Sequence, residues 1–288
     1  NSVAGNTVLG ENALDASVSG GNNTAIGKNA LTALTSASNN TAVGTSALGT
    51  TTTGGFNTAV GSTSLDACTT GGNNVAMGYG ALGANTTASE NTAIGFISLH
   101  VNTTGARNTA VGNASLDANT TASDNTAVGN SALTANTTGD NNAAVGANAL
   151  NNNTTGENLT AVGSNALGSN TTAANNTAVG KSALAATTTG GFNTAIGRDS
   201  LTANTSGGEL VAIGDNALAA NTTASHNTAV GRSAGFANTT GSNNTFIGYV
   251  AGVANETGAE NTAVGSHAFD AATTSARCSA VGFEALYL

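Results

Sequence analysis

Apolar positions recur along this chain with a fixed period. An apolar residue followed by glycine occurs seventeen times, from Leu9-Gly10 to Val281-Gly282, and every interval between these glycines is 17 residues. The residue before the glycine is always Val, Ile, Leu or Met, and Leu stands four residues after it in fourteen repeats. Loops tolerate length changes at little entropic cost. A period without insertions therefore predicts that each repeat stacks directly on the next.

The repeat at residues 125–141, NTAVGNSALTANTTGDN, is too short for a helical hairpin. Two helices of about six residues each would not be stable, and Asn, Thr and Gly are poor helix formers. Two extended segments fit better, Thr126–Val128 and Ala132–Leu133, with turns in the Gly-rich and Asn-rich stretches. We predict an all-β fold, a parallel β-solenoid (β-roll) of seventeen 17-residue coils, forming one uninterrupted repeat domain over residues 1–288.

The repeat also predicts where its side chains lie. We expect Val128 and Leu133 to point inward, Asn125 to lie at a turn, and stacked Asn side chains to bond to one another as in cross-β ladders. A glycine that recurs at every period indicates a corner with positive φ or close backbone approach. Replacing Gly129 by Val should therefore disrupt the local coil.

Composition adds constraints on partners. Aromatic residues are 3% of the chain and charged residues 7%, so the coil has a thin core, and lateral self-association would add apolar burial. A net charge of −9 with only six Lys and Arg argues against a nucleic-acid surface. The chain has no run of eighteen apolar residues, so the sequence predicts no membrane-spanning helix. Cys68 and Cys278 lie in distant coils, so we expect no disulfide between them within one straight chain.

The sequence Asn125-Thr126-Ala127-Val128-Gly129, followed by Ser131 and Ala132, resembles the head repeat of trimeric autotransporter adhesins. The longer form with Asn-Thr-Thr-Gly is similar to 17-residue repeats of phage tail-fibre and bacterial surface-fibre proteins. This resemblance implies a left-handed coil and an extracellular, cell-surface or virion fibre. It implies that the chain's partner is itself, as a trimer or a head-to-tail filament, with an unidentified host or surface ligand. We expect no enzymatic activity, cofactor or metal.

Candidate chemistry is sparse. His100, His226 and His267 fall in three different columns of the repeat, so we expect no metal site from them. One column holds Asp15, Asp66, Asp117 and Asp270 at multiples of three coils, about 14 Å apart at the closest, too far to share one Ca²⁺. Another column, expected to be outward and variable, holds Glu90, Arg107, Asp124, Glu209, His226, Glu260 and Arg277. Gly78–Gly83 matches a dinucleotide-binding fingerprint, but no helix is predicted after it.

Two features of the sequence allow more than one interpretation. Tyr79 and Phe96 share a column in successive coils beside Ile97, which indicates either a contact surface or local packing, including packing at an oligomer interface. Many Asn-x-Thr sequons occur, as at Asn85, and in a bacterial protein we attribute them to the ladder rather than to glycosylation.

Two classes of function fit the sequence. The first is an extracellular structural or adhesive fibre. The alternative is an ice-binding solenoid that uses Thr and Asn ladders; against it, adjacent residues such as Thr137 and Thr138 face opposite sides of a regular strand. Neither end carries an atypical capping repeat, so we expect the end coils to meet further solenoid or another domain.

Overall fold

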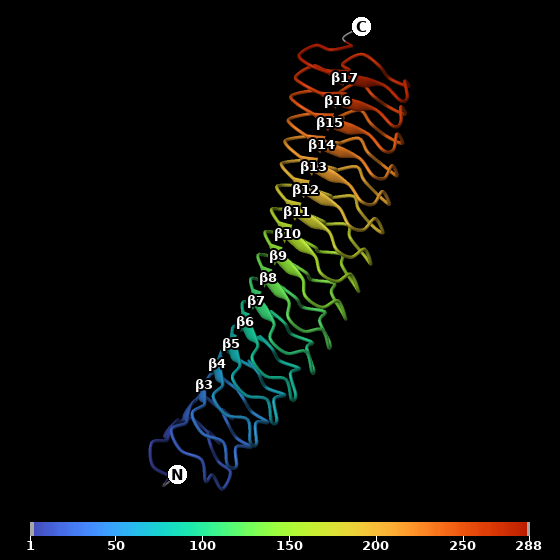
Figure 1. Cartoon of the computed structure of the whole chain (residues 1–288). Coiled ribbons are helices and arrows are strands. Elements are labelled where there is room, and N and C mark those ends of the chain that lie inside the picture. Colours follow the sequence, from blue (N-terminus) through green and yellow to red (C-terminus); the bar gives the residue numbers. More distant parts are fainter. Residues whose placement is uncertain (1–2, 287–288) are drawn as a thin grey trace. The chain divides into compact units, whose positions relative to one another are not determined.

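The computed structural model describes residues 3–286, and each repeat within them contributes one three-residue strand, with no helix among these residues (Figure 1). The repeats form two compact units, Asn1–Asn142 with the first eight strands and Ala143–Leu288 with the other nine. The strands are β1 (Thr7–Leu9), β2 (Thr24–Ile26), β3 (Thr41–Val43), β4 (Thr58–Val60), β5 (Val75–Met77), β6 (Thr92–Ile94), β7 (Thr109–Val111), β8 (Thr126–Val128), β9 (Ala143–Val145), β10 (Thr160–Val162), β11 (Thr177–Val179), β12 (Thr194–Ile196), β13 (Val211–Ile213), β14 (Thr228–Val230), β15 (Thr245–Ile247), β16 (Thr262–Val264) and β17 (Ser279–Val281).

Within each unit, consecutive strands pair in parallel with every residue opposite its equivalent 17 positions on. Ala110 of β7 lies opposite Ala127 of β8 in the first unit, and Ala161 of β10 lies opposite Ala178 of β11 in the second. Backbone bonds continue this pairing through the turns; the Leu116 N–H, for example, donates to the Ala132 carbonyl at 2.9 Å. The predicted parallel β-solenoid with 17-residue coils is confirmed.

The glycine that ends each strand forms a corner, as expected. Gly163 has a φ of +136°, and a Cβ placed there would lie 2.5 Å from the carbonyl oxygen of Gly180 in the next coil. Both the positive φ and the close approach of two backbones exclude a side chain. Each coil therefore needs glycine at this corner because its neighbour has the same corner directly against it.

The prediction that Val128 points inward is wrong. Ala127 is fully buried, whereas Val128 and its equivalents lie on the outer face, where Ile94 and Ile247 expose 38% and 40% of their surface. A strand sends successive side chains to opposite faces, so only one of the two apolar residues can face the interior. The small one does, which lets the strand approach the opposite wall of the coil.

The second predicted extended segment is also wrong, because Ala132–Leu133 lies in a turn. Leu133 is fully buried, as expected, but its φ is +52°, and Ser131 and Asp124 have φ of +54° and +61°. The equivalents of these three positions adopt the left-handed region throughout the chain, including β-branched residues such as Thr63. The coil closes within 17 residues through these left-handed corners, and burial of the leucine offsets the strain at its position.

Part of the interior is polar, because two columns of asparagine point into it. The opening ladder consists of the Asn that precedes most strands; the Asn108 N–H donates to the Asn91 Oδ1 at 2.9 Å. The corner ladder consists of the Asn of each Asn-Thr-Thr stretch; Asn102 Nδ2 donates to Asn85 Oδ1 at 3.1 Å. Amides of both ladders donate to one carbonyl, that of Gly105, each at 2.9 Å. Stacked Asn bonding is thus confirmed.

The placement of Asn125 at a turn needs correction. Asn125 belongs to the opening ladder and follows the bend at Asp124, but its side chain is fully buried and its N–H donates to Asn108 Oδ1 at 3.0 Å. An asparagine without partners belongs at the surface. Here the identical residue of the neighbouring coil supplies the partner, so burial carries no unsatisfied group.

Candidate interaction surfaces

In each of the two units, the outer face of the strands carries a column of aliphatic residues. Seventeen of seventeen repeats place Val, Ile, Leu or Met at the last strand position, although this position faces outward. The other outward strand position is Thr in most coils but also Val, Ala or Ser. We call the first set the outer aliphatic column: Leu9, Ile26, Val43, Val60, Met77, Ile94, Val111, Val128, Val145, Val162, Val179, Ile196, Ile213, Val230, Ile247, Val264 and Val281.

Beyond the corner glycine, the next outward position is variable and carries the aromatic residues noted in the sequence. Tyr79 and Phe96 stack with their ring centroids 5.5 Å apart and a 16° angle between planes, and both are more than half exposed. In the second unit the guanidinium of Arg232 lies 5.8 Å from the ring centroid of Tyr249. These rings pack on one another along the column, as local packing predicts, and they still leave apolar surface next to the outer aliphatic column.

The same variable position holds a cluster of charges in the second unit. Arg198 binds Asp215 of the next coil through Nε to Oδ1 at 2.9 Å and Nη2 to Oδ2 at 3.2 Å. Arg232 approaches Asp215 from the following coil at 3.7 Å. The hydrogen bond from Arg198 lowers the pKa of Asp215. The carboxylate thus joins three coils, and the cluster carries little net charge to attract an ionic partner.

The charged column predicted to face outward is exposed, and its side chains form ion pairs between coils. Arg107 binds Asp124 through Nε to Oδ1 at 2.7 Å and Nη2 to Oδ2 at 2.8 Å, and Arg277 Nε lies 2.8 Å from Glu260. The hydrogen bond from Arg107 lowers the pKa of Asp124. Exposed pairs of this kind contribute little to stability.

The histidines make separate local contacts. His100 Nδ1 lies 2.7 Å from the Gly80 carbonyl oxygen in the first unit. In the second unit His226 Nε2 lies 3.5 Å from Glu209, and His267 Nδ1 lies 3.1 Å from Asp270. Among residues 3–286 no three His, Cys, Asp or Glu side chains group closely enough to hold a metal ion.

The aspartate column likewise offers no shared site. Burial raises the pKa values of Asp66 and Asp117. Asp66 and Asp117 lie three repeats apart, and each interacts with different residues. Asp66 accepts a backbone hydrogen bond from Gly49, whereas His100 is the electrostatic neighbour of Asp117. They are isolated polar groups on a half-buried column rather than a cation site.

The sequons and the glycine-rich fingerprint both have structural explanations. Asn85 is fully buried and its Nδ2 donates to the Ala88 carbonyl at 3.0 Å, so its amide is inaccessible to a glycosyltransferase in the folded chain. Gly78 is the corner glycine after β5, and turns rather than a helix follow it through residue 84. A dinucleotide site of the helix-opening type therefore has no helix N-terminus here.

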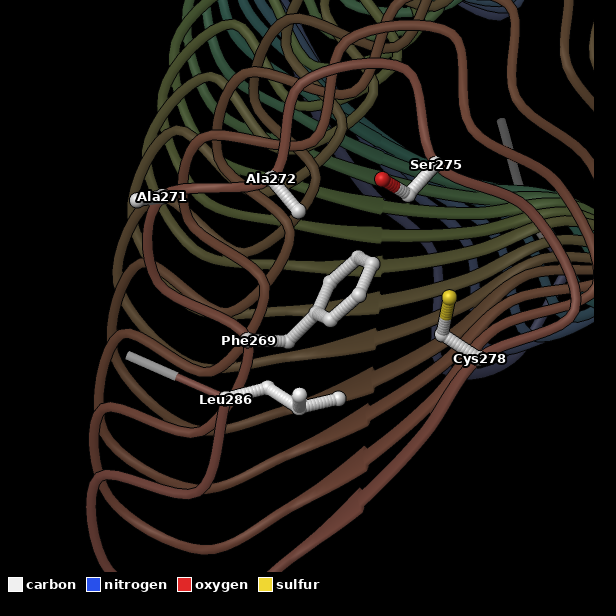
Figure 2. Close-up of a pocket in the computed structure, with 6 residues that line it drawn as sticks. All are labelled: Phe269, Ala271, Ala272, Ser275, Cys278 and Leu286. Atoms are coloured by element: carbon white, nitrogen blue, oxygen red, sulfur yellow. The ribbon is translucent and has the colours of Figure 1, made fainter. Parts of the chain in front are cut away.

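A cavity of about 270 Å³ lies in the last coil of the second unit. Figure 2 shows Phe269 and Leu286 pointing into the space that the Cys278 thiol and the Ser275 hydroxyl also face. Phe269 occupies the buried leucine position and Cys278 the opening-ladder position, so this space is the interior of the coil. Its lining has no charged side chain, and we assign no binding site to it.

Both cysteines are free thiols that replace ladder asparagines. Cys68 is buried at a corner-ladder position of the first unit, its Sγ 3.4 Å from the Gly71 carbonyl oxygen, and burial raises the pKa of its thiol. Cys278 is half-buried at an opening-ladder position of the second unit. Cys68 therefore lacks the lowered pKa of a reactive thiol.

No protein-family model matches the chain, and a search of curated proteins finds no significant match. Residues 3–286 contain no helix of the length and apolarity that crossing a bilayer requires. The β-solenoid fold itself fits a repeat structural protein.

Proposed function

We propose that this chain is a segment of an extracellular structural or adhesive fibre, built from several laterally associated copies, and that it has no enzymatic role. The observation that carries the proposal is the outer aliphatic column. An outward position on a strand accepts polar residues, as the neighbouring Thr column demonstrates, yet all seventeen residues of this column are aliphatic. A second copy covering the column explains why no polar residue occurs there.

Lateral association also suits the interior of the coil. One Leu and a few Ala per coil bury little apolar surface, and the rest of the core consists of asparagine ladders. Covering a partly exposed valine side chain contributes roughly 1 kcal/mol. Repeated over many coils, this contribution stabilises an assembly strongly even though each contact is small. The resemblance to trimeric adhesin heads and tail-fibre repeats favours three copies, a surface or virion location, and attachment to a surface ligand.

A matched pair of variants tests the proposal. Ile94→Thr/Val111→Thr/Val128→Thr removes aliphatic surface from three consecutive coils while keeping β-branched residues in the strands. Thr92→Ser/Thr109→Ser/Thr126→Ser changes the other outward column of the same three strands and serves as the control. Sedimentation velocity over a range of concentrations gives the mass of each, against 27.4 kDa for one chain.

We expect the unmodified chain and the control to sediment as an oligomer, most simply a trimer. The aliphatic variant should dissociate, because a loss of about 3 kcal/mol of binding free energy per chain raises the dissociation constant roughly 100-fold. An unmodified chain that remains monomeric at high concentration contradicts the proposal. So does an aliphatic variant that associates as strongly as the control.

A further inference from the structure

A second outward column is chemically uniform, and the fold makes almost no use of it. The second Thr of the Asn-Thr-Thr stretch is Ser or Thr in all seventeen repeats. Ser2 lies outside the described residues, and the other sixteen are all exposed. We call these sixteen the hydroxyl column: Ser19, Ser36, Thr53, Thr70, Thr87, Thr104, Thr121, Thr138, Thr155, Thr172, Thr189, Ser206, Thr223, Thr240, Thr257 and Thr274.

Hydrogen bonding within the protein does not explain this uniformity. Apart from Ser19, whose Oγ donates to the Thr35 carbonyl at 3.2 Å, no described side chain of the hydroxyl column bonds to the protein. The preceding threonine behaves differently, since Thr103 Oγ1 donates to the Thr120 carbonyl of the next coil at 3.0 Å. One threonine of each pair thus holds the coils together, and the other presents its hydroxyl to solvent.

Exposure to solvent does not explain the uniformity of the hydroxyl column either. The charged column is equally exposed and holds Asn, Phe, Glu, Arg, Asp and His at one and the same coil position. The position after the corner glycine varies as widely, from Lys181 to Phe283. An outward position of this solenoid therefore tolerates almost any side chain. A position that is always Ser or Thr is restricted by something outside the coil.

The surroundings of the hydroxyl column limit what that partner is. The six coil positions from Ala16 to Gly21 and their equivalents in the other coils contain no aromatic residue and no Lys or Arg. They hold only three acidic residues, Asp140, Glu157 and Glu256, and are otherwise mostly Ala, Gly, Ser, Thr and Asn. A sugar-binding surface would offer aromatic platforms, and an ionic ligand would need countercharges. This surface suits a neutral partner that bonds through hydroxyl groups at a regular interval.

We propose that the hydroxyl column binds ice. Successive coils place its hydroxyls about 4.8 Å apart, close to the shortest lattice repeat of hexagonal ice. Threonine outnumbers serine in the column, and its branched Cβ restricts χ1, so the hydroxyl and methyl groups keep fixed positions. A fixed, uncharged array of this kind holds water in an ordered arrangement that can join the crystal. Each of the two units carries eight coils of it.

The hydroxyl column contains only one threonine of each adjacent Thr-Thr pair. Adjacent threonines such as Thr137 and Thr138 do not form one flat array, and only the second of each pair belongs to the exposed column. The surface is also distinct from the outer aliphatic column, so ice binding and lateral association can be tested separately on the same chain.

The test compares two tyrosine double variants. Thr104→Tyr/Thr121→Tyr places bulky rings on the hydroxyl column, and Asn113→Tyr/Asn130→Tyr places them at the variable position, where Tyr79 and Phe96 already stand in neighbouring coils. Circular dichroism checks that both variants fold. Thermal hysteresis and the shape of ice crystals grown in each solution measure ice binding, and intact mass reports any covalent modification.

We expect thermal hysteresis and faceted crystals from the unmodified chain and the Asn variant, and loss of both from the Thr variant. Thr104→Val/Thr121→Val keeps the shape and the fold but removes two hydroxyls, so it should lose part of the hysteresis without losing stability. Absence of hysteresis in the unmodified chain overturns the proposal. Equal loss in both tyrosine variants, unfolding of the valine variant, or glycans on the column threonines found by intact mass would also overturn it.

Discussion

Replacing Thr187 by asparagine should stabilise the second unit, because it repairs a gap in the corner ladder. Thr187 is fully buried where most coils have Asn. Its Oγ1 donates to the Asn204 carbonyl at 3.2 Å, which leaves no proton for the preceding coil. The Oδ1 of Asn170 is consequently buried without a hydrogen-bond partner. On the other side, Asn204 Nδ2 reaches Thr187 Oγ1 only at 3.4 Å.

The expected gain follows from the bonds exchanged. An asparagine at 187 would donate to Asn170 Oδ1 and accept from Asn204 Nδ2, as Asn102 and Asn119 do in the first unit at 2.9 Å. A buried acceptor without a partner costs about 1–3 kcal/mol, and the lost threonine bond is worth about 0.5–1.5 kcal/mol. The free energy of unfolding should rise by about 1 kcal/mol, a shift of roughly 2–4 °C in Tm for a unit of this size.

The coil of Thr187 has the same neighbouring residue type as the coils that hold Asn at this position. Coils with Asn at this position have Gly or Ala three residues on, and the coil of Thr187 has Gly190. The Gly190 carbonyl already accepts from Asn176 Nδ2 at 2.8 Å, and the Gly105 carbonyl shows that such an oxygen takes a second amide. The substitution therefore reproduces an arrangement that the chain uses elsewhere.

Thermal and urea unfolding followed by circular dichroism measures the change, and hydrogen exchange of amides near residues 170–204 locates it. Thr189→Asn, in the same coil but exposed, adds the same group outside the ladder and is the control. The opposite change, Asn119→Thr, should destabilise the first unit by about 2 kcal/mol, because it interrupts two ladder bonds. If Thr187→Asn is no more stable than Thr189→Asn, the corner-ladder bonds do not contribute to the free energy of unfolding.

Three further predictions concern the backbone and the charges. Gly163→Ala should lower the free energy of unfolding by at least about 2 kcal/mol, because its φ of +136° and the Gly180 carbonyl both exclude a Cβ; Ser164→Ala is the control in unfolding experiments. Thr63→Asn should raise that free energy by about 0.5–1 kcal/mol, because a β-branched residue there has a φ of +54°; an unchanged or lower urea midpoint contradicts this. Arg107→Gln should raise the pKa of Asp124 toward its ordinary value of about 3.9, measured by NMR titration of its carboxyl group. Because the folded-state pKa of Asp124 is lowered, the contribution of this pair is present above that ordinary value and is lost as the pH falls through the folded pKa.

The sequence alone determined the period, and with it the length of each coil and the parallel register. A residue opposite its equivalent 17 positions on follows from a repeat without insertions. The glycine corner was predictable because only one residue type meets its backbone requirement. The inward position of Leu133 was predictable as well, since Leu is the largest residue that recurs in nearly every coil. The uniformity of the hydroxyl column is also visible in the sequence, but its lack of hydrogen bonds is not.

The tertiary structure decided which face of each strand is inside. Ala127 and Val128 are both apolar, and a strand of three residues offers no longer alternation to choose between them. It also decided that Asn125 is buried, since the Asn108 Oδ1 that its N–H bonds and the Asn142 N–H that donates to its own Oδ1 each lie 17 residues away. Local propensity does not place Leu133 in the left-handed region either. Closure of the coil and contact with an identical neighbour impose these conformations, because both constraints act between residues that are distant in sequence.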